Sequence, residues 1–434
     1  MGNPHALVKV INNEGTERTG LSMPRMRLSH LNSLEILQLV RVHGYISRSQ
    51  VAEKAGASPF LVSKICDSLL AGHFIAEAGH GDSTGGRRPT LLSLRPDFGR
   101  LIGVHLGSVN VRIALTDFKG NLIEYTKDRS HANDGPEVAM RRLMNLIDHM
   151  LQKSKLKYSD LNGIGIGVSG IVERSTGVMI FWPKLPLWMN VPVKKMLEDR
   201  YKTLVQLEDT SRTRAFAEYR LGGADAAKDF IYIAVGAGIG AALFLDGRLY
   251  SGAGGFAGEF GHITAFENGR LCSCGNRGCL ETLVSASTLI RKARHGLSAG
   301  LSNTLMEIAQ GDARTVSVEM LGQAARTGDR FTARLLSEAG VHLGRSIVGL
   351  VNLLNPELIV IGGGVASAVG DLLLPEIERV VHQRAMMQDV NQVQIRISKL
   401  GEKEWALGAT LLVVEKALAQ AFLKAPERKK RASR

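Results

Sequence analysis

Apolar residues follow two different spacings along the chain, and the spacing changes near residue 95. Between about residues 27 and 95 they recur every three or four positions in short blocks separated by glycine, which predicts short helices. From Leu101 onward, aliphatic runs typical of strands alternate with longer helical stretches, which indicates an α/β architecture. The sequence therefore predicts a small helical module in front of a larger α/β domain.

The α/β part contains two halves, each with a glycine-rich return between strands, near Gly107 and Gly238. Strands are expected at residues 101–116, 163–168, 204–207, 230–235 and 358–361. Helices are expected at residues 137–152, 211–221, 330–354 and 404–423. Two such halves predict a two-lobed fold with a cleft between the lobes.

One apolar stretch, residues 230–245, has to be weighed against a membrane span. Its sixteen residues fall short of the roughly 20 that a span needs, and three glycines divide it like a turn between buried strands. We therefore expect no membrane segment.

The helical module shows clear signals for helix ends. Ser47 is placed to cap a helix that ends at Gly56, and Ser58 to cap the next one, with Pro59 at its first helical position. A turn of only a few residues therefore joins the last two helices. This is the helix-turn-helix layout, in which the final helix lies in the DNA major groove.

The polar face of that final helix and the loop that follows supply the candidate DNA contacts. The candidates on the helix are Ser58, Pro59, Phe60, Ser63 and Lys64. Two short strands then flank a glycine-rich loop with Arg87 and Arg88, which suit the minor groove or its phosphates. A cluster of three helices can also serve as a protein–protein interface. The wing and its basic loop favour DNA as the partner.

Length and charge complete the division of the chain. Its 434 residues exceed the roughly 250 to 300 at which a single core stops growing. The formal net charge of +13 favours a polyanion such as DNA, RNA or anionic lipid. The predicted parts are a flexible extension (1–26), a winged helix-turn-helix DNA-binding domain (27–95), a two-lobed α/β domain (96–423, with lobes 96–222 and 223–423) and a basic tail (424–434).

Three of the four cysteines lie close together, and one histidine precedes them. His262, Cys272, Cys274 and Cys279 form the Cys3His set of a structural zinc site, in which protein fills all four tetrahedral positions. Clustered cysteines suit a metal better than several disulfides, and no secretory signal is evident, so we expect a reducing cytoplasm.

The stretch from Gly258 to Glu281 resembles the signature of the ROK family, a group of bacterial sugar kinases and sugar-responsive repressors with the actin-like ATPase fold. Residues 235–240 are similar to its second phosphate loop, and residues 361–365 to its adenosine-side loop. The resemblance covers residues 101 to about 423, and the winged module in front resembles that of the repressor branch. It implies a two-lobed sugar-kinase fold.

The resemblance also implies a sugar site. By motif it falls on Asp209, Glu259, His262 and Glu281, with Asp209 in the place of the base. Carboxylates accept hydrogen bonds from sugar hydroxyls, and zinc on one nitrogen of His262 would fix the tautomer that the other presents. Asp209 also suits a plain helix N-cap, and this alternative stays open.

The kinase signature itself is altered. Where the family's kinases carry Asp-x-Gly-Gly-Thr, this chain has His105-Leu106-Gly107-Ser108-Val109. Histidine does not replace a hard oxygen ligand of magnesium, and Val109 lacks the hydroxyl and should crowd the turn. We therefore expect no enzyme. Glu208, where the kinases usually have Asn, leaves the identity of the sugar open.

The function that follows is a sugar-responsive transcriptional regulator, a repressor released by a sugar or sugar phosphate. The alternative is an ATP-dependent sugar kinase with a regulatory DNA-binding module. One winged helix reads only a few base pairs, so two modules should bind a pseudo-palindromic operator. The resemblance likewise implies a homodimer or homotetramer.

Overall fold

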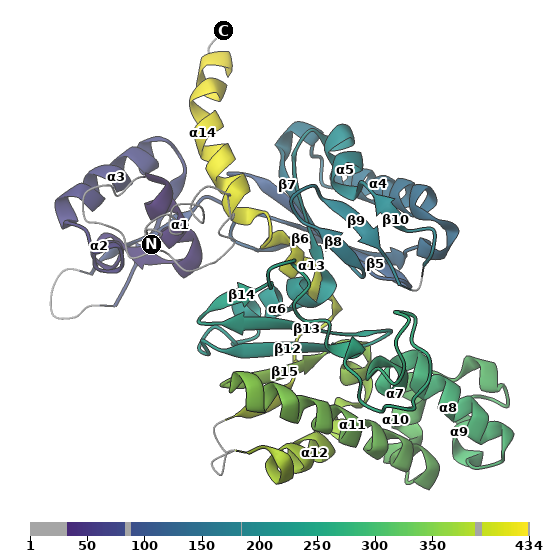
Figure 1. Cartoon of the computed structure of the whole chain (residues 1–434). Helices are drawn as coiled ribbons and strands as arrows, with labels where there is room; N and C mark the ends of the chain where they lie inside the picture. The colour runs from purple at the N-terminus through teal and green to yellow at the C-terminus, as the bar shows by residue number, and fades with distance from the viewer. Residues whose placement is uncertain (1–32, 83–87, 184, 387–392, 433–434) are drawn as a thin grey trace, which may run out of the picture.

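The computed structural model describes residues 33–82, 88–183, 185–386 and 393–432, with side chains up to residue 423. A small N-terminal unit, two lobes and a C-terminal helix are separate in Figure 1, and that helix stands beside the N-terminal unit. The expected flexible extension (1–26) and Arg87 lie outside the described residues.

The N-terminal unit has the expected three helices, capped as the sequence indicates. Its elements are α1 (Ser33–His43), β1 (Ile46–Ser47), α2 (Arg48–Ala55), α3 (Pro59–Ala71), β2 (Ile75–His80) and β3 (Thr90–Leu94). Ser47 and Gln50 form a reciprocal capping box, and Ser58 accepts a hydrogen bond from the backbone N–H of Leu61. The strands pair in the order β1-β3-β2, so α3 is followed by a β2–β3 wing.

The first lobe is built on a five-stranded sheet in the order β11-β7-β4-β5-β6. The sheet strands are β4 (Arg100–Leu106), β5 (Asn110–Thr116), β6 (Leu122–Arg129), β7 (Leu161–Val168) and β11 (Leu204–Asp209). Helices α4 (Pro136–Lys153) and α5 (Val193–Tyr201) pack against it, and β8 (Ile171–Glu173), β9 (Val178–Phe181) and β10 (Met189–Val191) form a small side sheet.

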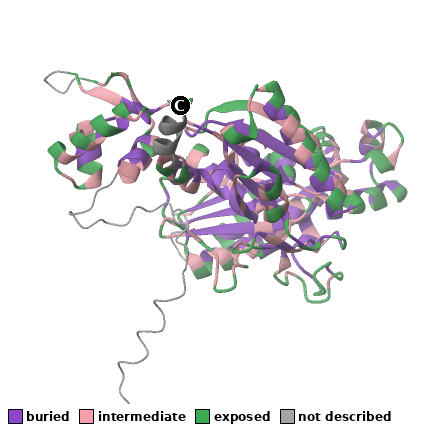
Figure 2. Cartoon of the chain, turned by 90° about the horizontal axis from the view of Figure 1, so that it is seen from above, coloured by how far each residue is buried: buried purple, intermediate pink, exposed green. Residues whose placement is uncertain are grey.

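The second lobe repeats this plan with the order β14-β13-β12-β15-β16. Its strands are β12 (Phe230–Val235), β13 (Ile239–Leu245), β14 (Arg248–Tyr250), β15 (Leu358–Gly362) and β16 (Gln394–Ile397). Its helices are α7 (Glu281–Val284), α8 (Ala286–Ser298), α9 (Asn303–Ile308), α10 (Val318–Arg326), α11 (Arg330–Leu354) and α12 (Gly364–Arg384). Buried residues concentrate in the strands of both sheets (Figure 2). The two-lobed α/β fold is thus confirmed.

Two helices cross between the lobes. Helix α6 (Thr210–Leu221) packs on the sheet of the second lobe, and α13 (Glu402–Thr410) packs on that of the first and against α6. The backbones approach so closely that a Cβ atom on Gly165 would lie 1.8 Å from the Ala409 carbonyl oxygen, and one on Gly103 would lie 2.0 Å from that of Ala406. Only glycine fits at these two strand positions.

The single helix predicted at 404–423 is wrong in one respect, because the structure bends it. Helix α13 ends at Thr410, and α14 (Val414–Ala432) continues at an angle of 43°. The bend lets Val414 and Leu418 join the apolar core of the N-terminal unit. Helix α14 also runs well past the predicted helix end at residue 423.

Within the described residues, no helix taken singly has the length and apolarity to cross a membrane. Helix α13 and the first part of α14 reach those limits only when the bent pair is counted together.

Alanine at Gly165 is expected to lower the free energy of unfolding by about 1 to 3 kcal/mol, because the new methyl group forces α13 away from the sheet. Gly349 in α11 is the matched control, since a Cβ there would meet nothing within 4 Å. Gly349→Ala should be neutral or stabilise by up to about 1 kcal/mol. Urea denaturation midpoints measure both, and equal effects would contradict the packing argument.

Candidate functional site

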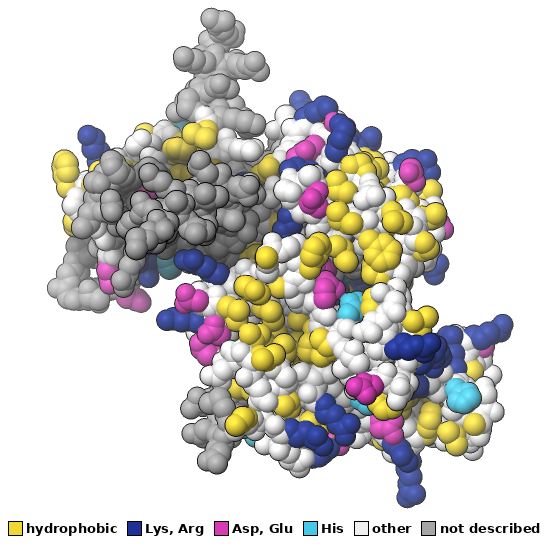
Figure 3. Space-filling model, viewed as in Figure 1, with side chains coloured by type: hydrophobic (Ala, Val, Ile, Leu, Met, Phe, Trp, Pro, Cys, Tyr) yellow, Lys and Arg dark blue, Asp and Glu magenta, His cyan; other side chains and the backbone are white. Residues whose placement is uncertain are grey.

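Three acidic side chains approach one another where the lobes meet. Asp209 ends β11, Glu259 lies in the loop after β14, and Glu281 begins α7. Burial, together with the charges of Asp209 and Glu281, raises the pKa of Glu259 to about 7, as expected for carboxylates that share one site. In Figure 3, acidic side chains lie beside a histidine between the lobes.

Two of these carboxylates are also anchored to the backbone. Asp209 Oδ1 accepts hydrogen bonds from the N–H groups of Ser211 (2.6 Å) and Arg212 (3.4 Å), so Asp209 is the N-cap of α6. Glu281 Oε2 accepts one from Ile239 N at 3.0 Å. Asp209 can therefore cap the helix and also take part in the acidic cluster, because both cap hydrogen bonds go to the same carboxylate oxygen, Oδ1.

His262 connects this acidic cluster to the cysteines. Its Nε2 lies 4.0 Å from Glu259 Oε2, and its Nδ1 lies 3.6 Å from Cys272 Sγ. The ligand atoms of His262, Cys272, Cys274 and Cys279 all lie within 4.8 Å of one another, so these four residues could hold a metal ion.

The loop reaches this shape because of two glycines. Gly275 and Gly278 have φ angles of 91° and 69°, in the region that favours glycine. A Cβ on Gly278 would lie 1.6 Å from the Phe266 carbonyl oxygen. These two glycines therefore let the loop turn tightly enough to bring the cysteines close together.

An ion-pair cluster that sequence reasoning missed holds Glu208. Arg174 Nε lies 2.9 Å from one carboxylate oxygen, and Arg212 NH1 lies 3.1 Å from the other. Burial raises the pKa of Glu208 to about 7, while Arg174 opposes this shift. The Glu208 charge is thus neutralised within the protein. Arg174 also donates to Ser251 Oγ at 2.8 Å, which links the two lobes.

The base of the cleft contains a second cluster that the sequence did not reveal. Arg214 NH2 lies 3.1 Å from His105 Nε2, and its guanidinium carbon lies 3.9 Å from the centre of the Trp405 ring. Arg112 lies 4.7 Å from the same ring. His105 is 2% exposed, whereas Val109 is 66% exposed, so the expected crowding of the turn by Val109 is wrong. The residues that pack the strand end are His105 and its arginine partner.

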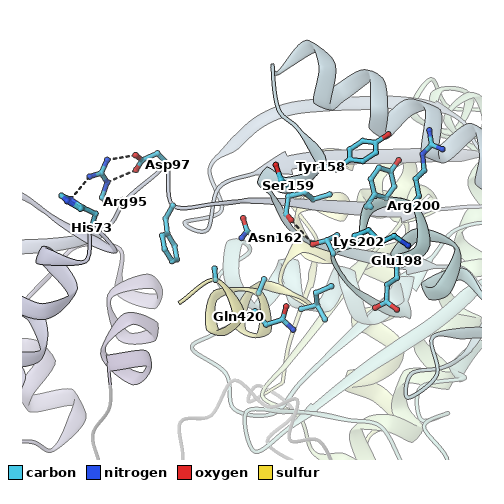
Figure 4. Close-up of a pocket in the computed structure, with 17 residues that line it drawn as sticks. His73, Arg95, Asp97, Tyr158, Ser159, Asn162, Glu198, Arg200, Lys202 and Gln420 are labelled. Carbon is cyan, nitrogen blue, oxygen red and sulfur yellow. Dashed lines mark hydrogen bonds and ion pairs between the residues drawn. The ribbon is translucent and has the colours of Figure 1, made fainter. Parts of the chain in front are cut away.

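A large cavity lies elsewhere, at the junction of the N-terminal unit, the first lobe and α14. It measures about 970 Å³. Figure 4 shows His73, Arg95 and Asp97 on one side of it, with Lys202 and Gln420 across from them. Among the described residues, the candidate metal ligands lie outside this cavity.

The predicted DNA-facing residues gather on one face of α3, with one exception. Ser58, Pro59 and Lys64 are exposed, and Phe60 is 82% exposed. Ser63 is half-buried, and its Oγ accepts a hydrogen bond from Arg48 NH1 at 2.7 Å.

Arg48 is a basic residue on this surface that sequence reasoning missed. It also forms an ion pair with Asp67 at 2.7 Å. Only its charge at the first position of α2 could have suggested it. Arg88 is exposed at the start of the returning wing strand.

A family model described as the ROK family matches residues 101–416. The chain is 32% identical over 392 residues to the xylose repressor of Caldicellulosiruptor bescii, which covers 90% of this chain and 97% of that protein. Among solved structures, it is similar to a ROK family transcriptional regulator, a homolog of the E. coli MLC protein. That match has a TM-score of 0.76 and 26% identity, and it covers 91% of this chain and 98% of that one.

Kinases match a smaller part of the chain. A ROK family glucokinase from Streptomyces griseus, solved with glucose and AMPPNP, is 26% identical, with a TM-score of 0.65. The match covers 72% of this chain and 98% of the glucokinase. The two-lobed part is thus common to kinases and regulators. The match to the regulator structure covers a larger share of this chain because it also includes the N-terminal unit.

Replacing Arg212 with alanine is expected to cost about 3 kcal/mol or more, because it breaks a buried ion pair in which both side chains are under 7% exposed. Arg334, which pairs with Glu338 at the same spacing on an exposed surface, is the matched control. Arg334→Ala should leave the denaturation midpoint unchanged. Equal losses in the two variants would show that burial of the Glu208 pair is unimportant.

Proposed function

The chain belongs to the ROK family. We propose that it is a sugar-responsive transcriptional regulator that binds DNA and represses transcription until a sugar or sugar phosphate binds to it. The observation that carries the proposal is that the candidate effector site and the DNA-binding unit are connected within one chain. An acidic cleft and a winged helix-turn-helix lie in one chain, and the helices that cross beneath the cleft lead to the DNA-binding unit.

The proposed effector site consists of Asp209, Glu259, His262 and Glu281. Their oxygens and the free imidazole nitrogen suit a ring of vicinal hydroxyls, which donate and accept hydrogen bonds at fixed spacing. An effector that lacked a matching hydroxyl would leave a buried group unpaired, at about 1 to 3 kcal/mol for each lost bond.

We infer that the metal beside this site is a structural zinc ion. Tetrahedral zinc with bonds of about 2.3 Å to sulfur and about 2.0 Å to nitrogen would separate two sulfurs by about 3.8 Å and a sulfur from a nitrogen by about 3.5 Å. The corresponding separations are 3.7 Å between Cys274 and Cys279, and 3.6 Å between Cys272 and His262. Zinc would fix the loop and orient His262 toward the effector.

Kinase activity is the alternative, and the base of the cleft argues against it. The guanidinium of Arg214 lies against His105, at the strand end where the kinase signature has its magnesium-organising aspartate. A fixed positive charge there repels a divalent cation, and the buried imidazole offers no hard oxygen ligand. A sugar sensor binds its ligand without magnesium and without phosphoryl transfer. The Arg214–His105 pair is therefore compatible with a sensing role.

Helix α6 offers the shortest physical route from the effector to DNA. Its first turn is capped by Asp209, and its other end places Tyr219 and Arg220 around a small cavity shared with α1 and Glu415 of α14. Arg41 of α1 also lies 3.5 Å from Glu415. Closure of the lobes on an effector would shift α6 and so bias the orientation of the DNA-binding unit.

The DNA-bound form is proposed to be a homodimer or homotetramer on a pseudo-palindromic operator. One α3 helix contacts only a few base pairs, so two copies are needed for useful selectivity. Ser58, Pro59, Phe60, Ser63 and Lys64 would face bases, and Arg88 with Arg87 would contact the minor groove or phosphates.

Glu259→Ala tests the proposed function most directly. The purified protein should bind DNA containing its own promoter region and release it when the matching sugar is added. The variant should keep its DNA affinity and lose the release, with at least a tenfold weaker sugar response, because Glu259 lies in the proposed effector site and far along the chain from the DNA-binding unit. Electrophoretic mobility shifts with a sugar panel measure both. Normal release by the variant would place the signal outside this cleft.

Zinc content gives a second prediction. The wild-type protein should contain about one zinc ion per chain, and Cys274→Ala should lose the metal together with the sugar response. Cys66→Ala is the control, since Cys66 is buried in the core of the N-terminal unit and should not change the metal content. Mass spectrometry of the metal decides it, and a zinc-free protein with a normal sugar response would refute the structural role.

The exposed lysine of α3 gives a third prediction. If Lys64 contacts a phosphate, Lys64→Ala should weaken DNA binding and reduce the slope of log affinity against log salt by about one. Lys195, exposed on the first lobe and paired with Asp199, is the control. Its alanine variant should show the wild-type slope. A salt titration in which both variants match the wild type would remove Lys64 from the phosphate contacts.

A further inference from the structure

Arg214 differs from the other arginines around the cleft because it has no carboxylate partner. Arg112 pairs with Glu402 at 2.5 Å, and Arg212 pairs with Glu208 at 3.1 Å. In the described part of the chain, Arg214 forms no ion pair, and its Nε is buried without a hydrogen-bond partner. Asp209 interacts with Arg214 electrostatically and Tyr232 forms a hydrogen bond with it, but neither is an ion-pair partner. A buried guanidinium without a paired carboxylate favours binding of an anion.

His105 presents a second unpaired donor in the same place. Arg214 NH2 donates to His105 Nε2 at 3.1 Å, so the imidazole carries its proton on Nδ1. His105 Nδ1 is buried and also has no partner. Burial and the neighbouring Arg214 hold the pKa of His105 well below its usual range, so the ring stays neutral. His105 and Arg214 therefore each present one N–H donor that lacks an acceptor, and so does the Nε of the neighbouring Arg112.

The position of this cluster relates it to the effector site. Arg214 lies three residues after Ser211, on the same face of α6, and Ser211 contacts the second glycine-rich return at Gly240. Asp209, at the start of the helix, is near enough to interact electrostatically with Arg214. His105 ends the strand that leads into the first return. Carboxylates thus occupy the upper turn of α6, and a cation lies one turn deeper, between the two returns.

The stacking of Arg214 on Trp405 leaves the edge of the guanidinium available for hydrogen bonds. The ring contacts the flat face of the guanidinium at 3.9 Å, whereas hydrogen bonds form along the guanidinium edge. One edge nitrogen is bound to His105, and the Nε edge is unpartnered. Stacking and anion binding therefore do not compete for the same atoms.

We propose that Arg214 and His105 bind the phosphate of a phosphorylated sugar whose hydroxyls are held by Asp209, Glu259 and Glu281. This rests on the proposed function and selects one effector class within it. A phosphate monoester supplies charged acceptor oxygens to both orphan donors, and the guanidinium supplies positive charge without magnesium. A neutral sugar leaves the two donors unpaired. A free phosphate ion has the same anionic chemistry, and the experiment separates it.

Isothermal titration calorimetry without added magnesium tests the proposal on the full-length, zinc-loaded protein. The neutral probes are glucose, N-acetylglucosamine and xylose. Their phosphorylated partners are glucose 6-phosphate, N-acetylglucosamine 6-phosphate and xylose 5-phosphate, and inorganic phosphate is tested alone. One phosphorylated sugar is expected to bind about 10- to 100-fold more tightly than its neutral partner. Arg214→Gln should remove this difference and leave the affinity for the neutral sugar unchanged. Arg345→Gln, an exposed arginine on α11, should behave as wild type.

The outcomes separate the phosphate subsite from the sensing function. Equal affinities within each pair, or no binding of any phosphorylated sugar, would overturn the subsite. If a neutral sugar then binds and Glu259→Gln abolishes that binding, the sugar-sensing function stands while the subsite falls. An equal loss for both members of a pair in Arg214→Gln, with a lowered melting temperature, would make Arg214 structural. Inorganic phosphate that binds as tightly as the sugar phosphate would make this a free-anion site and overturn the assignment.

Discussion

The backbone contact of α13 with the sheet of the first lobe is the constraint on which the rest of the molecule depends. Gly103 and Gly165 let the helix backbone lie directly on two strands, and Gly408 lets it lie equally close to Thr213 of α6. Helices packed so closely fix the angle and separation of the lobes. The cleft, its charged base and the route to the N-terminal unit are all set by this crossing.

The charges around the crossing give the cleft its chemistry. Acidic groups lie at the first turn of α6, and the arginine pairs of Glu208 and Glu402 are neutralised within the protein. Arg214 adds a positive charge beside His105 that has no ion-pair partner among the described residues. A kinase needs a negative, oxygen-rich site for magnesium at this depth, whereas this chain has a cation there. The charges at the base of the cleft therefore support the proposed role in ligand binding.

The attachment of the N-terminal unit explains how binding could reach DNA. Helix α14 contributes Val414, Ala417 and Leu418 to the apolar core of that unit, and Val413 just before it joins the same core. The Phe422 ring lies 4.8 Å from the Phe74 ring, tilted by 52°. A large cavity lies on the other side of α14, against the first lobe. The core of the unit continues into α14 and also into the first lobe through Leu101 and Phe118. A movement of the crossing helices can therefore be passed on through α14 as a rotation of α3.

The sequence by itself determined the elements whose signals are local. Ser47, Gly56 and Ser58 set the ends of the short helices within one turn, and the four metal-binding residues lie within eighteen positions of one another. Only the tertiary structure decided the bend after Thr410 and the partners of Arg214 and Ser63. The Arg214–His105 contact spans 109 positions, and residue spacing carries no information about a pair that meets only when two sheets close on the crossing helices. Caps and metal loops depend on a few neighbouring dihedral angles, whereas these contacts depend on the packing of the whole core.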